Sequence, residues 1–112
     1  MDEQTNTNEQ TADIMLTGDM VENLTDKHFT IASAISVDKP DYNNPKLTRK
    51  KIIATIILKD GTQIEMYVNK TSQMRVASLR GTKLKDWVGY EGELKVLAQM
   101  VGDKEKKVIY IK

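Results

Sequence analysis

The chain contains no cysteine and a single histidine, His28, among its 112 residues. The absence of cysteine excludes disulfide bonds, thiol nucleophiles and thiolate-ligated zinc, and one histidine leaves a metal site without its commonest ligand. Phosphate-binding loops of the GxxxxGK or GxGxxG type are also missing, and no serine, histidine and aspartate pattern or carboxylate pair has the spacing of an acid–base site. We therefore expect no enzyme, no metal site and no cofactor.

Long apolar runs are missing as well. The longest, residues 52–58, is interrupted by Thr55 and is far shorter than the roughly 20 residues that cross a bilayer. The first residues, MDEQTNTNEQTADIM, have neither the basic start nor the apolar stretch of a secretory signal. These features predict a cytoplasmic protein without a membrane partner.

Basic side chains are absent from the first part of the chain. Residues 1–25 contain six acidic side chains and no Lys or Arg, so residues 26–112 hold all 17 basic side chains against the remaining 10 acidic ones. The net charge of +1 thus divides into −6 for the first segment and +7 for the second. Such a division predicts a polyanionic partner for the basic part, with the acidic part acting either as a solvated tail or as an internal competitor for the basic surface.

The same division suggests the domain organisation. Residues 1–12 are polar and lack hydrophobic periodicity, and we expect a disordered acidic tail there because so few apolar side chains cannot offset the entropy of ordering. Residues 13–112 are enough for one modest core and too few for two domains. A short helical turn is expected within this domain at residues 19–24.

Alternating apolar and polar residues predict the first three strands. Residues 28–37 form one predicted strand, with a single face that carries Phe29, Ile31, Ser33, Ile35 and Val37. Residues 47–59 predict a second strand, and Asp60-Gly61 predicts a tight hairpin into a third strand at residues 63–69. In the third strand Tyr67 is expected to face outward.

The period changes from that of a strand to that of a helix after Asn69. Met74, Val76, Ala77 and Leu79 have helical spacing, with Thr71 or Ser72 expected as the N-terminal cap and Gly81 as the stop. Alternation returns at residues 93–101 and 107–112, which predict two final strands joined by a charged turn at residues 102–106. Trp87 is expected to anchor the core between the helix and the fourth strand.

Five strands with one helix between the third and the fourth match the order in which a five-stranded Greek-key barrel closes. Residues 29–111 resemble small single-domain OB-fold proteins, particularly those that bind single-stranded DNA. The resemblance rests on the order of elements, on the long loop at residues 38–46 that holds both prolines, and on the tract Trp87-Val88-Gly89-Tyr90-Glu91-Gly92-Glu93. It implies an all-β OB-fold Greek-key barrel with one short helix between strands three and four.

The resemblance also implies that nucleic acid crosses the outer face of strands two and three, between the first loop and the last hairpin. The sequence offers cations for phosphates and tyrosines for bases there: Lys39, Tyr42, Lys46, Arg49, Lys51, Tyr67, Asn69, Lys104, Lys106, Lys107 and Tyr110. Stacking and phosphate contacts tolerate any base sequence. We therefore expect sequence-independent binding of single-stranded nucleic acid, with DNA favoured over RNA, in a process such as DNA replication or recombination.

A protein–protein interaction module is the alternative that the sequence leaves open. Each of these residues also has a structural explanation. Tyrosine favours strands and packs across them, which can account for Tyr67, and Tyr110 can cover the barrel. Lys104, Lys106 and Lys107 can form a solvated hairpin tip. The same barrel could then hold a protein partner through its groove, a strand edge or the acidic N-terminal segment. Salt-dependent binding to an oligo-dT strand would distinguish the two functions.

Overall fold

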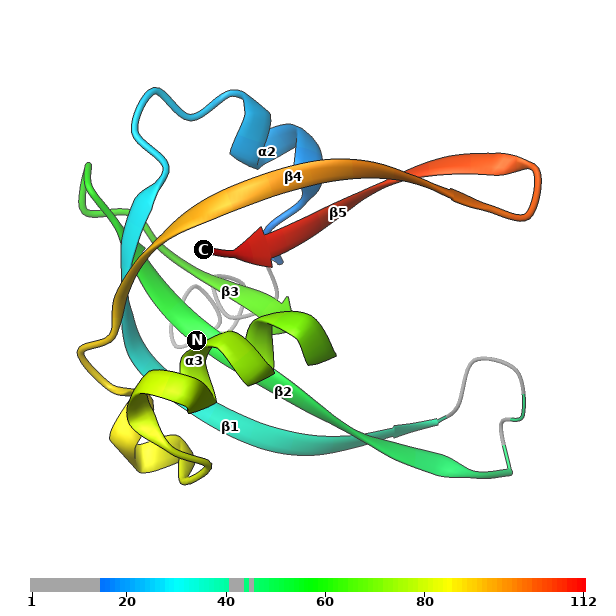
Figure 1. Cartoon of the computed structure of the whole chain (residues 1–112), viewed down its shortest axis with the longest axis horizontal. Helices are drawn as coiled ribbons and strands as arrows, with labels where there is room; N and C mark the ends of the chain where they lie inside the picture. The colour runs from blue at the N-terminus through cyan, green and yellow to red at the C-terminus, as the bar shows by residue number, and fades with distance from the viewer. Residues whose placement is uncertain (1–14, 41–43, 45) are drawn as a thin grey trace, which may run out of the picture.

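The computed structural model describes residues 15–40, 44 and 46–112, so the expected tail at residues 1–12 lies outside the described residues. The described part confirms the all-β class, with five antiparallel strands in one sheet and few helical residues. In chain order the elements are α2 (Gly18–Glu22), β1 (His28–Pro40), β2 (Thr48–Leu58), β3 (Gln63–Val68), α3 (Lys70–Arg80), the 3₁₀ helix η1 (Leu84–Trp87), β4 (Glu91–Val101) and β5 (Lys104–Ile111) (Figure 1).

The strand order across the sheet is β3-β2-β1-β4-β5. β1 pairs with β2 along most of its length but with β4 only over residues 28–30. The far ends of the two long hairpins therefore separate from each other, and both extend to the same side of the body (Figure 1). We call residues 37–40 and 48–51 the β1–β2 arm, and residues 98–101 and 104–107 the β4–β5 arm.

The inner face of the sheet carries alternate apolar residues of β2 and β3. Ala54, Ile56 and Met66 are fully buried, and the Asp60-Gly61 turn joins the two strands with Gly61 at a φ of 91°, a conformation that glycine adopts without strain. Trp87 is buried as expected, and its indole N–H donates to the Gly81 carbonyl at 2.8 Å. The core is therefore closed at one end by the residues that follow α3.

β1 does not keep one face toward the core, and this part of the prediction was wrong. Ile31 pairs with Ile56, but Ser33 already pairs with Thr55, so Ala32 is an extra residue in a β-bulge. A bulge shifts the alternation by one residue. Beyond it Ala34 packs on the core, whereas Ile35 lies on the opposite face and is 53% exposed.

α3 departs from the prediction at its N-terminal cap. Asn69 is the N-cap, and its side-chain oxygen accepts from the Ser72 N–H at 2.9 Å. Ser72 is fully buried. Its hydroxyl has a hydrogen-bond partner there, because it accepts from the Ile111 N–H at 2.9 Å. Met74 and Leu79 are exposed and Val76 is buried in the core, so a polar contact joins α3 to β5.

β5 begins at Lys104, three residues earlier than predicted. The turn before it is only Gly102-Asp103, with Gly102 at a φ of 64°. The charged residues that follow therefore belong to the strand, and consecutive ones point to opposite faces of the β4–β5 arm.

Candidate functional site

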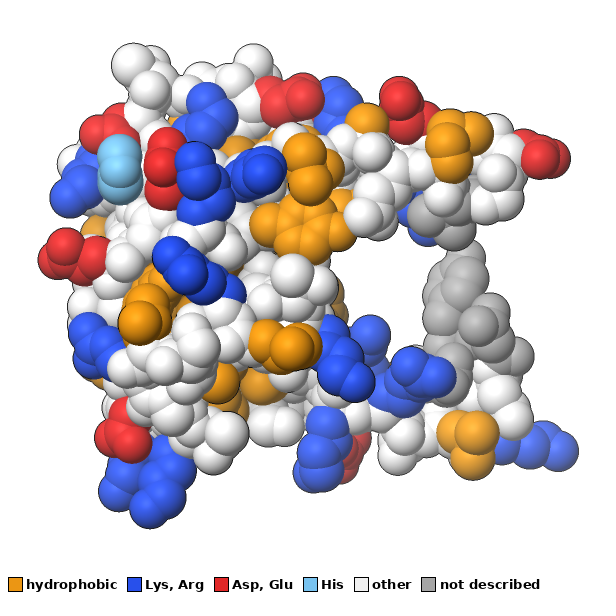
Figure 2. Space-filling view, viewed as in Figure 1, with side chains coloured by type: hydrophobic (Ala, Val, Ile, Leu, Met, Phe, Trp, Pro, Cys, Tyr) orange, Lys and Arg blue, Asp and Glu red, His pale blue; other side chains and the backbone are white. Residues whose placement is uncertain are grey.

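An open groove with a volume of about 1160 Å³ lies between the two arms. Basic residues line it from both sides: Lys39, Arg49 and Lys51 from the β1–β2 arm, and Lys106 and Lys107 from the β4–β5 arm. Figure 2 shows Lys and Arg side chains gathered over the β1–β2 arm, beside the hollow. The structure thus brings together cations that lie up to 68 residues apart in the chain, from Lys39 to Lys107.

The groove continues onto the outer face of the β1–β2–β3 sheet. Strand pairing aligns Ile35 with Ile53, and Ile53 with Tyr67, so these three residues form one row across the sheet. Lys51 and Arg49 follow on the same face of β2 toward the arm, because alternate residues of a strand share a face. An apolar row therefore borders a basic one.

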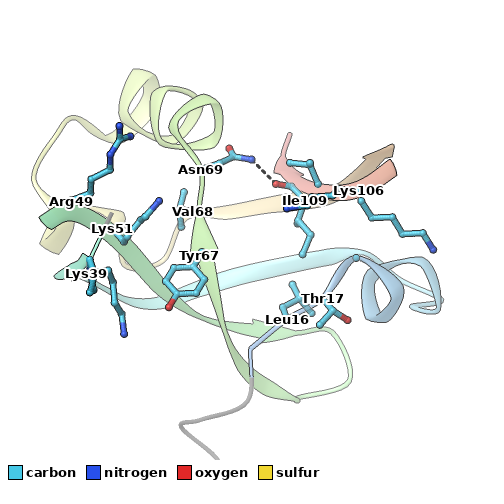
Figure 3. A pocket seen from close by; sticks show the side chains of 14 residues that line it. Leu16, Thr17, Lys39, Arg49, Lys51, Tyr67, Val68, Asn69, Lys106 and Ile109 are labelled. Atoms are coloured by element: carbon cyan, nitrogen blue, oxygen red, sulfur yellow. Dashed lines mark hydrogen bonds between the residues drawn. The ribbon is translucent and has the colours of Figure 1, made fainter. Parts of the chain in front are cut away.

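Tyr67 is the aromatic residue of this row. Its side chain is 48% exposed, whereas its neighbours Met66 and Val68 point into the core and are 0% and 3% exposed. Figure 3 shows Tyr67 between Lys39 and Lys51 on one side and Leu16 and Thr17 on the other. One face of the sheet thus supports the ring while much of it stays accessible to a ligand.

Asn69 also lines the groove, but its side chain already has two structural partners. Its oxygen caps α3, and its Nδ2 donates to the Ile109 carbonyl at 2.9 Å (Figure 3). This second bond joins the end of β3 to β5, which are not hydrogen-bonded as strands. Asn69 therefore has a structural role in the wall of the groove, because it holds the end of β3 and the start of α3 against β5.

Lys107 has acidic partners from α2. Its Nζ donates to Asp19 Oδ1 at 2.6 Å and to Glu22 Oε1 at 2.7 Å. These two hydrogen bonds raise the pKa of Lys107 well above its usual range, because both stabilise the protonated ammonium. Lys107 is thus a groove residue whose charge is compensated within the chain.

Three of the predicted site residues that the structure describes are not among those that line the groove. Lys46 lies in the turn that leads into the β1–β2 arm, and Lys104 lies at the tip of the β4–β5 arm, both exposed. Tyr110 is half-buried, and its hydroxyl accepts from Gln99 Nε2 at 2.6 Å. Tyr42 lies outside the described residues.

The first residue of α2 and the two residues before it line the groove, and the sequence did not predict them: Leu16, Thr17 and Gly18. Met15 forms a parallel bridge with Glu65 of β3, and the Leu16 N–H donates to the Glu65 carbonyl at 2.7 Å. Only the excess of acidic residues in this part of the chain hinted at a contact with the basic surface. Neither its position nor its partner could be read from that excess.

Neither a metal centre nor a membrane span is found in the described ranges. Residues 15–40, 44 and 46–112 contain no group of three acidic or histidine side chains arranged to hold a metal ion. No helix within these ranges is both long and apolar enough to cross a bilayer. Comparison with known proteins finds no relative, since no family model, no curated protein and no solved structure matches the chain.

Proposed function

We propose that this protein binds single-stranded nucleic acid, with DNA favoured, in the groove between its two arms. The observation that supports this most directly is the convergence in one groove of five basic side chains and an exposed tyrosine. Phosphates require cations, and unpaired bases stack on aromatic rings. Neither contact reads a particular base, so binding is largely independent of sequence.

The groove is suited to a single strand rather than to a duplex. In a duplex the faces of the bases are covered by stacking, and a tyrosine on a sheet cannot reach them. An unpaired base can lie on Tyr67, with Ile53 and Ile35 extending the surface across the row. Lys39 and Lys51 line the groove on one side of Tyr67 and can meet phosphates next to the stacked base.

We infer further that the sheet is an OB-type Greek-key barrel. The order β3-β2-β1-β4-β5 becomes that of a closed barrel when β3 lies beside β5. Two contacts support this closure: Asn69 Nδ2 bonds the Ile109 carbonyl, and the Ser72 hydroxyl accepts from the Ile111 N–H. α3 follows β3 in the chain and packs against β5, as expected of a helix that covers one end of such a barrel.

The decisive experiment is a fluorescence-anisotropy titration with labelled dT oligonucleotide, the matching duplex and an RNA of the same length. Three to five phosphate contacts predict that log K falls against log salt with a slope of roughly −2 to −3.5, at about −0.7 per phosphate for single strands. We expect the single strand to bind more tightly than the duplex and DNA more tightly than RNA. No binding at low salt, or equal binding of duplex and single strand, would refute the proposal.

Such a binder would suit DNA replication or recombination, in which single strands are exposed. A protein-interaction module remains the second candidate, and the exposure of Met74 and Leu79 on α3 favours it, at 65% and 63%. Flat or absent oligonucleotide binding at every salt concentration would favour that candidate over nucleic-acid binding.

A further inference from the structure

An acidic helix is attached to the basic groove by an ionic contact. The Lys107 ammonium has three N–H donors, and two of them are used by Asp19 at 2.6 Å and Glu22 at 2.7 Å. The carboxylates belong to α2 and lie 88 and 85 residues before Lys107 in the chain. The contact therefore joins two distant parts of the fold, beside the groove that Lys107 lines.

The position of α2 is determined by contacts on both of its sides. Gly18 packs so closely on β5 that a Cβ atom at this position would come within 2.6 Å of Lys107 Cβ. Thr17 caps the helix by accepting from the Met20 N–H at 3.2 Å, and Leu16 hydrogen-bonds the edge of β3. Residues 15–22 thus run from the edge of β3 to β5, and α2 lies against the β4–β5 hairpin (Figure 1).

We propose that Lys107 belongs to the phosphate-binding surface of the groove and that Asp19 and Glu22 occupy it in the unbound protein, so that α2 competes with nucleic acid. This inference rests on the proposed function. A phosphodiester offers two oxygens that share one negative charge, and these are anionic acceptors like the carboxylate oxygens of Asp19 and Glu22. A strand that reaches Lys107 must therefore displace α2 or leave Lys107 unused.

The competition has a measurable consequence for the salt dependence of binding. In the wild-type protein a phosphate at Lys107 only replaces the carboxylates, so this contact adds little to affinity. Without the carboxylates Lys107 adds one phosphate contact, which steepens the slope of log K against log salt by about 0.7. If the variant and the wild type bind equally at 1 M salt, this change in slope makes the variant roughly eightfold tighter at 50 mM salt. The gain should fall as the salt concentration rises.

The test compares Asp19→Asn/Glu22→Gln with Asp103→Asn/Glu105→Gln in oligo-dT titrations over a range of salt. Both double variants remove two negative charges, but Asp103 and Glu105 lie at the turn and on the strand of the β4–β5 arm instead of on α2. We expect the roughly eightfold gain and the steeper slope for the α2 variant only. An equal gain in the arm variant would show that only general electrostatics is at work and would overturn the proposal.

Lys107→Gln, made alone and in the α2 variant, tests whether the gain in oligo-dT affinity comes from Lys107. We expect loss of the whole gain in the α2 variant and a clearly smaller loss of affinity in the wild-type background, because Asp19 and Glu22 compete with phosphate for Lys107 only in the latter. Equal losses in both backgrounds would mean that α2 does not restrict access to Lys107, and the inference would fail.

Amide hydrogen exchange separates failure of this inference from failure of the proposed function. The Val21 N–H donates to the Thr17 carbonyl at 3.1 Å, and the Leu16 N–H donates to Glu65. We expect both amides to exchange faster in Asp19→Asn/Glu22→Gln than in the wild type, with no oligonucleotide present, because α2 has lost its ionic contact. Unchanged exchange refutes the attachment of α2 by Lys107, whereas faster exchange with no oligonucleotide binding by any variant refutes the proposed function alone.

Discussion

Met66 and Tyr67 are neighbours in β3 and lie on opposite faces of the same sheet. Met66 contacts the core and is 0% exposed, whereas Tyr67 lies beside Ile53 on the outer face and is 48% exposed. Burial of Met66 stabilises the fold through the hydrophobic effect, but much of the Tyr67 ring has no protein atoms to pack against. The comparison indicates that the inner face maintains the structure and that the outer face is available to a ligand.

Met66→Ala should have the largest effect, and the effect should be on stability. Truncation of a fully buried methionine leaves a cavity and costs about 2–5 kcal/mol of the free energy of unfolding. Urea denaturation followed by circular dichroism measures this loss. At a temperature where the variant is still folded, its affinity for oligo-dT should be close to that of the wild type. A loss of affinity beyond the unfolded fraction would contradict the separation of the two faces.

Tyr67→Ala should show the converse pattern. Loss of one stacked base predicts a loss of about 1–3 kcal/mol of binding free energy, or roughly 5- to 150-fold in Kd. Because the residue is half exposed, the free energy of unfolding should change by less than the Met66→Ala value. The matched control is Tyr67→Phe, which keeps the ring and should bind almost as tightly as the wild type. Unchanged affinity in Tyr67→Ala would remove this residue from the site.

Lys51→Gln tests whether the basic part of the outer face belongs to the same site. Removal of one phosphate contact should make the salt slope shallower by about 0.7 and lower the affinity up to about eightfold at 50 mM salt. Lys50 is the matched control, since it precedes Lys51 on the strand, points to the other face and pairs with Asp38 at 3.6 Å. If Lys50→Gln changes the slope as much as Lys51→Gln does, net charge rather than the groove determines binding.

The smallest effect concerns the hairpin turn that sets which residues of β3 face inward. Hydrogen bonds from the Thr62 side chain and backbone lower the pKa of Asp60 below its ordinary value of 3.8, and the Thr62 N–H donates to Asp60 Oδ1 at 2.9 Å. A carboxylate with a lowered pKa stabilises the fold above the unfolded-state pKa, and this contribution is lost as the pH falls through the folded-state value.

Stability measured by urea denaturation should therefore decline below about pH 4, and less steeply in Asp60→Asn than in the wild type. Asparagine keeps an oxygen acceptor for Thr62 but does not titrate. Parallel pH profiles for the two proteins would show that the Asp60 carboxylate does not support the turn.

The parts of the fold that follow local periodicity could be predicted from the sequence. Ile64, Met66 and Val68 alternate with polar residues over a short strand that follows a D-G turn, so the inner face of β3 was predicted correctly. In β1 the alternation is ambiguous, because Ala34 and Ile35 are both apolar. The bulge at Ala32 directs Ala34 to the core, and that choice depends on pairing with β2.

The candidate site could be predicted only in part for the same reason. Lys39 and Lys51 were predicted as contact residues because the resemblance to OB-fold proteins implies binding beside the first loop, which holds Lys39, and along the second strand, which holds Lys51. Asn69 was predicted as a contact residue, yet its side chain connects α3 and β3 to β5. Leu16 and Thr17 were missed, since nothing in their immediate neighbours indicates that they meet β3.

By itself the sequence determined the order of the strands, the inner and outer residues of β3, and the division between an acidic first segment and a basic remainder. Each of these depends on neighbouring residues or on composition, because the two-residue period of a strand is a property of the backbone. Only the tertiary structure decided that two hairpin arms enclose one groove and that Lys107 meets Asp19 and Glu22. These contacts join residues far apart in the chain, and they form only when the sheet curls and brings β5 close to both α2 and the end of β3.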